Sequence, residues 1–168
     1  RQSTLKGIDD ILCAAAEGVR AIIPPSIAEQ AENVERDEPF YSDTYRTAHE
    51  SLERYVDAAG LEFLYAIVMR KDGTAYELIS NLTPEQKAAN ADPLKEILLK
   101  TYNDASPIMR EAARTVKRSI DVAEDEYGYF RSCLVPIKLS NGVVTLFGAD
   151  MEISDVNERL LRDLLMNV

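Results

Sequence analysis

The chain has 168 residues, of which 46% are hydrophobic, and this size and content suit one folded domain with a real core. Nineteen Lys and Arg residues against 29 Asp and Glu residues give a formal net charge of -10. Because that charge repels the phosphates of DNA and RNA, nucleic acid is excluded as an expected partner. No apolar run reaches the roughly 20 residues that a membrane-spanning helix needs, so we expect a soluble piece excised from a longer protein.

The first third of the chain is expected to be helical and to be interrupted twice. Apolar residues recur every three or four positions over residues 3–23, which predicts one amphipathic helix that Pro24-Pro25 ends. The capping-box pattern that begins at Ser26 predicts a short second helix. After another interruption, the apolar spacing over residues 45–56 predicts a third helix that ends near Gly60.

Two stretches of the chain have the pattern of β-hairpins. Residues 61–70 are rich in aromatic and aliphatic side chains, a turn follows at Lys71-Asp72-Gly73, and alternation continues to Ser80. A second pair of strands is predicted within residues 124–150, joined by a turn at Asn141-Gly142.

The segment between the hairpins is expected to be helical. Thr83, Asp92 and Ser106 each stand before a proline, and this cap-then-proline pattern predicts three helix starts. Ser154-Asp155 predicts a closing helix. Hairpins with helices segregated between them indicate an α+β fold on an antiparallel sheet.

The cysteines and the acidic runs give little sign of a metal site. Cys13 and Cys133 have no histidine at metal-ligand spacing, so they are either two buried thiols or one disulfide, and we favour independent small core residues. Acidic runs such as Asp9-Asp10 and Glu124-Asp125-Glu126 are typical of solvated faces rather than of a calcium site or an acid-base pair. We therefore expect neither a metal nor a cofactor.

No catalytic set is apparent in the sequence. The single histidine, His49, stands in mid-helix without a Ser or Cys motif that uses it as a base, and is expected to be a surface or half-buried helix residue. The seven glycines form no phosphate-binding loop. The sequence therefore predicts a protein that is not an enzyme.

The strongest candidate site lies on the second hairpin, where one strand carries Arg131-Ser132-Cys133 and the other ends at Asp150. A guanidinium within a strand needs an acceptor and an aspartate needs a donor, so one interpretation is an Arg131–Asp150 ion pair, or two charges that face outward. The other is a ligand pocket, because a cation, an anion and several hydroxyls over a sheet suit a small molecule with a carboxylate, an amine or both. The candidate ligand-binding residues are Arg131, Asp150, Tyr65, Tyr76, Tyr127, Tyr129 and Ser132.

Five marks in the sequence resemble, in order and spacing, the single-Cache domains, which are extracytoplasmic PAS-like sensing modules of bacterial chemoreceptors and sensor kinases. They are Asp72-Gly73 after a strand, Tyr-x-x-Ala-Ser-Pro at 102–107, Gly-x-Phe-Arg-Ser at 128–132, Pro136, and Gly148-x-Asp150. The resemblance covers most of the chain. It departs from the family where Tyr129 replaces a residue that is small in many members, and the lack of Trp excludes a tryptophan-walled pocket.

The resemblance implies roles for several of these residues. The ligand is expected between the sheet and the helical insert. Arg131 falls on a strand position that often meets an acid group of the ligand, and Asp150 on a position that in some members meets an amine. Tyr65 and Tyr76 are implied as wall residues.

The resemblance also implies the domain organisation. The whole chain, 1–168, would be one ligand-sensing domain: a helical stalk and cap (1–60), an antiparallel sheet with its helical insert (61–153), and a C-terminal helix (154–168) leading to a transmembrane segment outside this fragment. The implied function is that of a periplasmic sensor domain of an inner-membrane receptor, above all a methyl-accepting chemotaxis protein, with a histidine kinase or a diguanylate cyclase as other outputs.

The expected ligand is a small carboxylate or an amino-acid-like molecule, and the expected assembly is a homodimer through the N-terminal helix. Ligand binding would displace the closing helix relative to the first. The alternative is an interaction module of the same fold, in which the pocket is filled by its own side chains, Arg131 pairs with Asp150, and the partner is a protein or a second copy.

Overall fold

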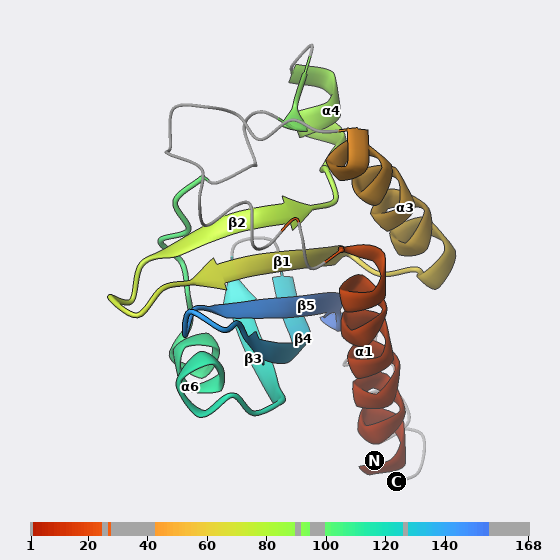
Figure 1. Ribbon diagram of the computed structural model, residues 1–168. Coiled ribbons are helices and arrows are strands. Elements are labelled where there is room, and N and C mark those ends of the chain that lie inside the picture. Colours follow the sequence, from red (N-terminus) through yellow and green to blue (C-terminus); the bar gives the residue numbers. More distant parts are fainter. Residues whose placement is uncertain are drawn as a thin grey trace, which may run out of the picture.

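A five-stranded antiparallel sheet forms the centre of the computed structural model (Figure 1), which describes residues 2–24, 27, 43–89, 92–94, 100–125 and 128–154. The strands are β1 (Phe63–Met69), β2 (Ala75–Ser80), β3 (Ser119–Asp125), β4 (Gly128–Lys138) and β5 (Val144–Glu152). Their order across the sheet is β2-β1-β5-β4-β3. The helices are α1 (Gln2–Ile22), α3 (Asp43–Ala59), α4 (Pro84–Ala89) and α6 (Pro107–Thr115). The predicted α+β class with a long first helix is confirmed.

Both predicted hairpins are present. Strands β1 and β2 pair through a turn in which Gly73 has φ 86°, and β4 and β5 pair through a turn in which Gly142 has φ 85°. A positive φ is readily adopted by glycine because it has no Cβ, so these two residues fix the turns that the sequence predicted.

Strand β3 is not among the elements that the sequence predicted. It lies at the edge of the sheet and pairs with β4 alone, and its Val122 side chain is 52% exposed. An edge strand that is open to water on one face has a weak apolar alternation, which explains why the pattern was missed.

Helices cover the two faces of the sheet separately (Figure 1). Helix α1 packs against the face that carries Cys133, Phe147 and Ala149, while α6 packs against the face that carries Leu134 and Leu146. Side chains of a strand alternate between faces, so consecutive residues of β4 and β5 contact different helices. This alternation decides which candidate residues meet.

Two predicted helix caps are confirmed. At the start of α4, Gln86 N donates to Thr83 Oγ1 at 3.2 Å and Thr83 N donates to the Gln86 side chain at 2.9 Å, which is a reciprocal capping box. At the start of α6, Met109 N donates to the Ser106 hydroxyl at 3.0 Å, and a proline holds the first turn.

Three predicted helical segments lie outside the described residues, entirely or nearly so: the short helix after Ser26, the stretch after Asp92-Pro93, and the closing helix beyond Ser154. In the part of the chain that the structure describes, no helix combines the length and the apolar character needed to cross a membrane.

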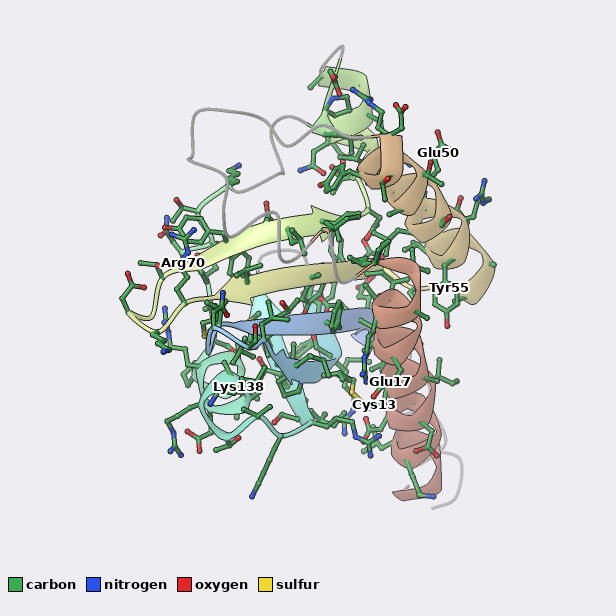
Figure 2. The ribbon with its side chains drawn as sticks, viewed as in Figure 1. Cys13, Glu17, Glu50, Tyr55, Arg70 and Lys138 are labelled. Carbon is green, nitrogen blue, oxygen red and sulfur yellow. A yellow bond between two sulfur atoms is a disulfide. The ribbon has the colours of Figure 1, made fainter. Side chains whose placement is uncertain are left out.

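Cys13 of α1 and Cys133 of β4 form a disulfide, with their Cα atoms 5.2 Å apart (Figure 2). The interpretation of two independent core thiols is therefore wrong. It failed because the two residues are 120 positions apart in the sequence, a separation that says nothing about their distance in the fold. Closing so long a loop lowers the entropy of the unfolded chain and stabilises the fold by about 4–5 kcal/mol.

Candidate functional site

A row of polar side chains crosses three neighbouring strands on the face of the sheet that α6 covers. Ser132 of β4 is the register partner of Asp121 on β3 and of Asp150 on β5, so the three side chains share this face. All three are half-buried. With strands about 4.8 Å apart, the Cα atoms of the two aspartates stand about 10 Å from each other, with the serine between them.

Tyr65 of β1 extends this row across the glycine of β5. It is the register partner of Gly148, and its hydroxyl donates to Asp150 Oδ1 at 3.0 Å. A Cβ atom on Gly148 would stand 2.2 Å from the Tyr65 ring. Gly148 is therefore required because the ring lies flat across β5 at this point, and this position brings the hydroxyl to Asp150.

The segment before α6 adds two more hydroxyl groups. The Ser106 hydroxyl that caps α6 also donates to Asp121 Oδ2, at 2.6 Å. Tyr102 packs with Tyr65 against the apolar cluster beneath α6, and its backbone N–H donates to the Ala75 carbonyl at 2.8 Å. The helical insert and the sheet thus build this site together. The Asp150 cluster consists of Asp150, Ser132, Asp121, Tyr65, Tyr102 and Ser106.

The environment of Asp150 opposes its ionisation. The pKa of this carboxyl is raised from 3.8 to about 6, chiefly by burial, with the negative charges of Asp121 and Glu62 acting in the same direction. Hydrogen bonds from Ser132 and Tyr65 lower the same pKa and only partly offset burial. Asp150 is therefore ionised at pH 7, at a cost in free energy that a nearby cation would relieve.

The two tyrosines are held in their neutral, proton-donating form. Burial, followed by the charge of Asp150, raises the pKa of Tyr65 well above its ordinary value and the pKa of Tyr102 to about 12. Among the described residues, no Lys or Arg is one of the main influences on the Asp150 or Tyr65 pKa values. The site offers hydroxyl donors and carboxylate acceptors, and this combination suits a positively charged group.

Arg131 does not meet Asp150. Its register partner on β5 is Met151, which places Arg131 on the α1 face, and its Nε and Nη2 atoms donate to Asp9 at 2.5 and 2.9 Å. The interpretation of an Arg131–Asp150 ion pair is therefore wrong. So is the interpretation of Asp9 as part of a solvated acidic run.

The remaining candidates are divided between the two faces. Tyr76 is the partner of Val68, on the face opposite to Tyr65, and the Arg70 guanidinium lies 4.6 Å from its ring centroid. Tyr129 is 41% exposed, and a hydrogen bond with Glu124 raises its pKa. The structure thus brings Asp150, Ser132 and Tyr65 together, leaves Tyr76 and Tyr129 apart from them, and does not describe Tyr127.

Three members of the Asp150 cluster were missed from the sequence. Asp121 lies on the unpredicted strand β3. Tyr102 and Ser106 belong to the Tyr-x-x-Ala-Ser-Pro element and Ser106 was also recognised as a helix cap, but neither residue was assigned to the site. The signal that could have found Asp121 is the short alternation Ile120-Asp121-Val122 within β3.

His49 is buried, with 6% of its surface exposed, and is not the surface or half-buried residue that was expected. Its Nε2 donates to the Ser80 carbonyl at 3.0 Å, and Glu53 one turn later lies 3.5 Å away. Glu53 also accepts from Leu82 N and from Lys87. Burial lowers the His49 pKa, so this group joins α3 to the end of β2 as a neutral structural contact.

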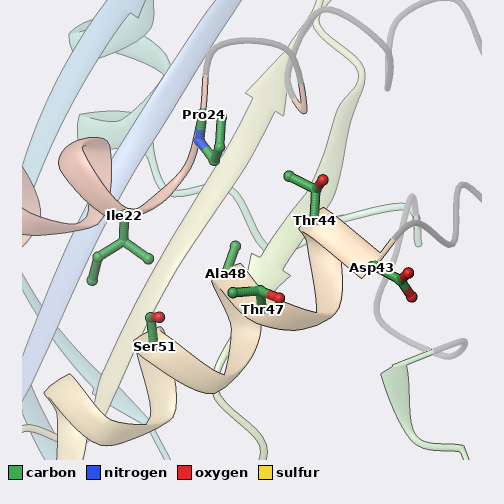
Figure 3. Close-up of a pocket in the computed structure, with 7 residues that line it drawn as sticks. All are labelled: Ile22, Pro24, Asp43, Thr44, Thr47, Ala48 and Ser51. Carbon is green, nitrogen blue, oxygen red and sulfur yellow. The ribbon is translucent and has the colours of Figure 1, made fainter.

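Two surface hollows lie away from the Asp150 cluster. The first, of about 340 Å³, opens between the end of α1 and the first turns of α3 (Figure 3). It is lined by Ile22, Pro24, Asp43, Thr44, Thr47, Ala48 and Ser51. The second, of about 370 Å³, is lined by Arg46, His49, Glu50, Leu82, Asp92, Pro93 and Leu94.

Comparison with known proteins finds similarity in structure alone. No protein-family model matches the sequence, and no curated protein matches it significantly. The E. coli DcuS sensor domain matches with a TM-score of 0.52 and 12% identity, over 90% of this chain and 96% of that one. At such identity the match shows the fold and nothing beyond it.

Two other sensor structures match more distantly. The periplasmic domain of RsbU from Chlamydia trachomatis has a TM-score of 0.46 at 14% identity, over 94% of this chain and 59% of that one. The sensory domain of the Campylobacter jejuni chemoreceptor Tlp3 with isoleucine bound has a TM-score of 0.39 at 13% identity, over 92% of this chain and 61% of that one. The chain thus spans about three fifths of each of these two structures.

The sheet order, the long first helix and the helical insert agree with the fold that the five sequence marks predicted. The chain has the α+β fold of the DcuS sensor domain.

Proposed function

We propose that the chain is the ligand-binding sensor domain of a bacterial transmembrane receptor, and that its ligand carries a positively charged amine that binds at Asp150. The observation that carries the proposal is the Asp150 carboxyl, which accepts from the Tyr65 and Ser132 hydroxyls and whose pKa is raised to about 6. A cation within hydrogen-bonding distance favours the ionised form of such a group. The site is thus prepared to gain free energy from an amine.

The geometry favours a ligand with an amine over a ligand that has carboxylates alone. Amines and amino-acid-like molecules satisfy the requirement for a cation. A molecule that presents carboxylates alone does not, because Arg131 is on the opposite face and is bound to Asp9. Tyr65 and Ser132 fix the orientation of the Asp150 carboxylate by their hydrogen bonds to it, and the carboxylate in turn orients the amine. Arg131 makes no contact with the ligand in this proposal.

The five sequence marks and the fold support the proposal that the domain belongs to a receptor. The chain acts as one sensing domain, 1–168, on the periplasmic side of an inner membrane, within a membrane-anchored chemotaxis receptor. It performs no catalysis. It forms a homodimer through α1, where the Ile11 side chain is 52% exposed. Sedimentation of the wild type and of Ile11→Lys tests the dimer, which the substitution should weaken.

A thermal-shift screen at pH 7.5 tests the ligand class. The panel pairs each amine or amino acid with the carboxylate of the same carbon skeleton. A ligand at a hundredfold excess over its dissociation constant stabilises the folded state by about 2.7 kcal/mol. We expect a concentration-dependent rise in melting temperature with amines that is lost in Asp150→Asn and kept in Glu152→Gln, an exposed carboxylate on the same strand.

Two outcomes would contradict the proposal. A rise with carboxylates alone would exclude the amine. A flat response across the panel would favour the interaction module whose cluster is satisfied by its own side chains.

A further inference from the structure

Three consecutive residues of β4 connect the Asp150 cluster to helix α1. Ser132 faces the cluster, where it is the register partner of Asp150. Arg131 and Cys133 point to the other face because successive side chains of a strand alternate, and both of them bind α1. One short piece of strand thus carries Ser132 on the face of the Asp150 cluster and Arg131 and Cys133 on the face of α1.

Helix α1 is attached to β4 at two points, one helical turn apart. Asp9 accepts two hydrogen bonds from Arg131, and both side chains of this pair are partly buried, at 17% exposure for Arg131 and 26% for Asp9. Cys13, four residues later and so on the same face of the helix, is bonded to Cys133. Figure 2 shows this disulfide between the helix and the sheet.

These two attachments differ in kind from the contacts of α1 with β1 and β5. Against β1 and β5 the helix packs through apolar side chains such as Leu12 and Val19, and apolar contacts can slide by small shifts. A covalent bond cannot be exchanged during a conformational change, and a bidentate ion pair fixes orientation as well as distance. Two such points along the helix oppose both its translation and its rotation relative to β4.

We propose that α1 and β4 move as one body, so that a displacement of Ser132 in the Asp150 cluster is carried through Arg131 and Cys133 to α1. The signal then leaves the domain as a movement of the sheet and α1 together. Sliding of α1 along the sheet is excluded. The proposal rests on the proposed function only in taking the Asp150 cluster as the input.

Hydrogen exchange of α1 amides tests this coupling without any ligand. Asp150→Asn, which neutralises the site, is made in the native protein and in a Cys13→Ala/Cys133→Ala background. In the native background we expect the exchange of amides in residues 9–13, as well as in β4, to change by about threefold or more. Without the disulfide, the change in β4 should persist while the change in α1 falls to less than half.

Two results would overturn the proposal: an α1 response of equal size in both backgrounds, or a response of β4 in the native protein that does not reach α1. If the cysteine-free protein does not fold, Asp9→Asn in the disulfide-bonded protein tests the other attachment. In the Asp9→Asn background, the exchange response of α1 should decrease in the residues N-terminal to Cys13 and persist in the residues C-terminal to it. An undiminished response along the whole helix would refute the coupling. Asp10→Asn, an exposed neighbour, is the matched control.

A failure of this coupling is distinguishable from a failure of the proposed function. The exchange experiment contains no ligand, so a flat thermal-shift screen leaves its outcome unchanged. Conversely, an amine can bind at Asp150 whether or not α1 follows β4.

Discussion

Replacing Asp150 by asparagine should stabilise the protein at neutral pH. Burial raises the Asp150 pKa from 3.8 to about 6, so the folded state resists an ionisation that the unfolded chain accepts. The protonated carboxyl therefore favours folding fully below pH about 4, and this contribution is lost as pH rises through about 6. A shift of about two pKa units corresponds to about 3 kcal/mol, which is an upper limit because the side chain is half-buried.

Urea unfolding of the wild type and of Asp150→Asn between pH 4 and pH 8 measures this effect. The asparagine oxygen can still accept from Tyr65, and the substitution removes one titrating carboxyl. The difference in free energy of unfolding should be near zero at pH 4 and reach about 1–3 kcal/mol in favour of the variant above pH about 7. Glu152→Gln should stay within about 0.5 kcal/mol of the wild type throughout. A difference that does not depend on pH, or a destabilised Asp150→Asn at pH 7, would refute the reasoning.

Gly148→Ala should destabilise the protein by about 1–3 kcal/mol in urea unfolding, because the new Cβ would overlap the Tyr65 ring. Gly7→Ala is the control, because a Cβ there would have no atom within 4 Å, and it should not destabilise the protein. Equal effects of the two substitutions would contradict the packing argument. Tyr65→Phe removes a hydrogen bond that lowers the Asp150 pKa, so an NMR titration of that carboxyl should find a pKa above the wild-type value rather than below it. Burial lowers the His49 pKa, so the stability that its neutral form gives is lost as pH falls below about 6.5. In a pH series of melting temperatures, His49→Gln should therefore lose less stability at acid pH than the wild type. An unchanged slope would exclude His49 as a source of the acid-side loss.

Elements whose signals are local could be predicted from the sequence. The turns at Gly73 and Gly142, the capping box at Thr83 and the cap at Ser106 all depend on neighbours within four residues, and all are present. Such patterns reflect backbone conformation and short hydrogen bonds, which the chain specifies before it folds.

Contacts between distant residues could not be predicted. The faces of Arg131 and Asp150 follow from strand register, in which a shift of one residue moves every side chain to the other face. The disulfide and the Asp9 pair depend on where α1 crosses β4, a tertiary fact that no local pattern contains. In the sequence alone, Asp9 cannot be distinguished from the solvated acidic residues of a helix, because its partner Arg131 is 122 positions away.

The candidate site was predicted in part for the same reason. Asp150 was found because an acid at the end of an apolar strand stands out, and Tyr65 because it lies in the paired hairpin. Asp121 was lost together with β3, whose exposure hides its alternation. Tyr76 was assigned to the same wall as Tyr65 although the bulge between Ala66 and Ile67 changes the register of β2.

The most direct test of the central claim is the pH dependence of binding of the amine that the thermal screen identifies, measured by calorimetry between pH 5 and pH 8. An alkyl amine stays charged over this range because its ordinary pKa, like that of lysine, is about 10, so only the protein titrates. If the amine binds ionised Asp150, its affinity should be constant above pH about 7, fall by up to about tenfold per pH unit below about 6, and be lost in Asp150→Asn. An affinity that does not change with pH, or that survives in Asp150→Asn, would contradict the claim that Asp150 holds the ligand.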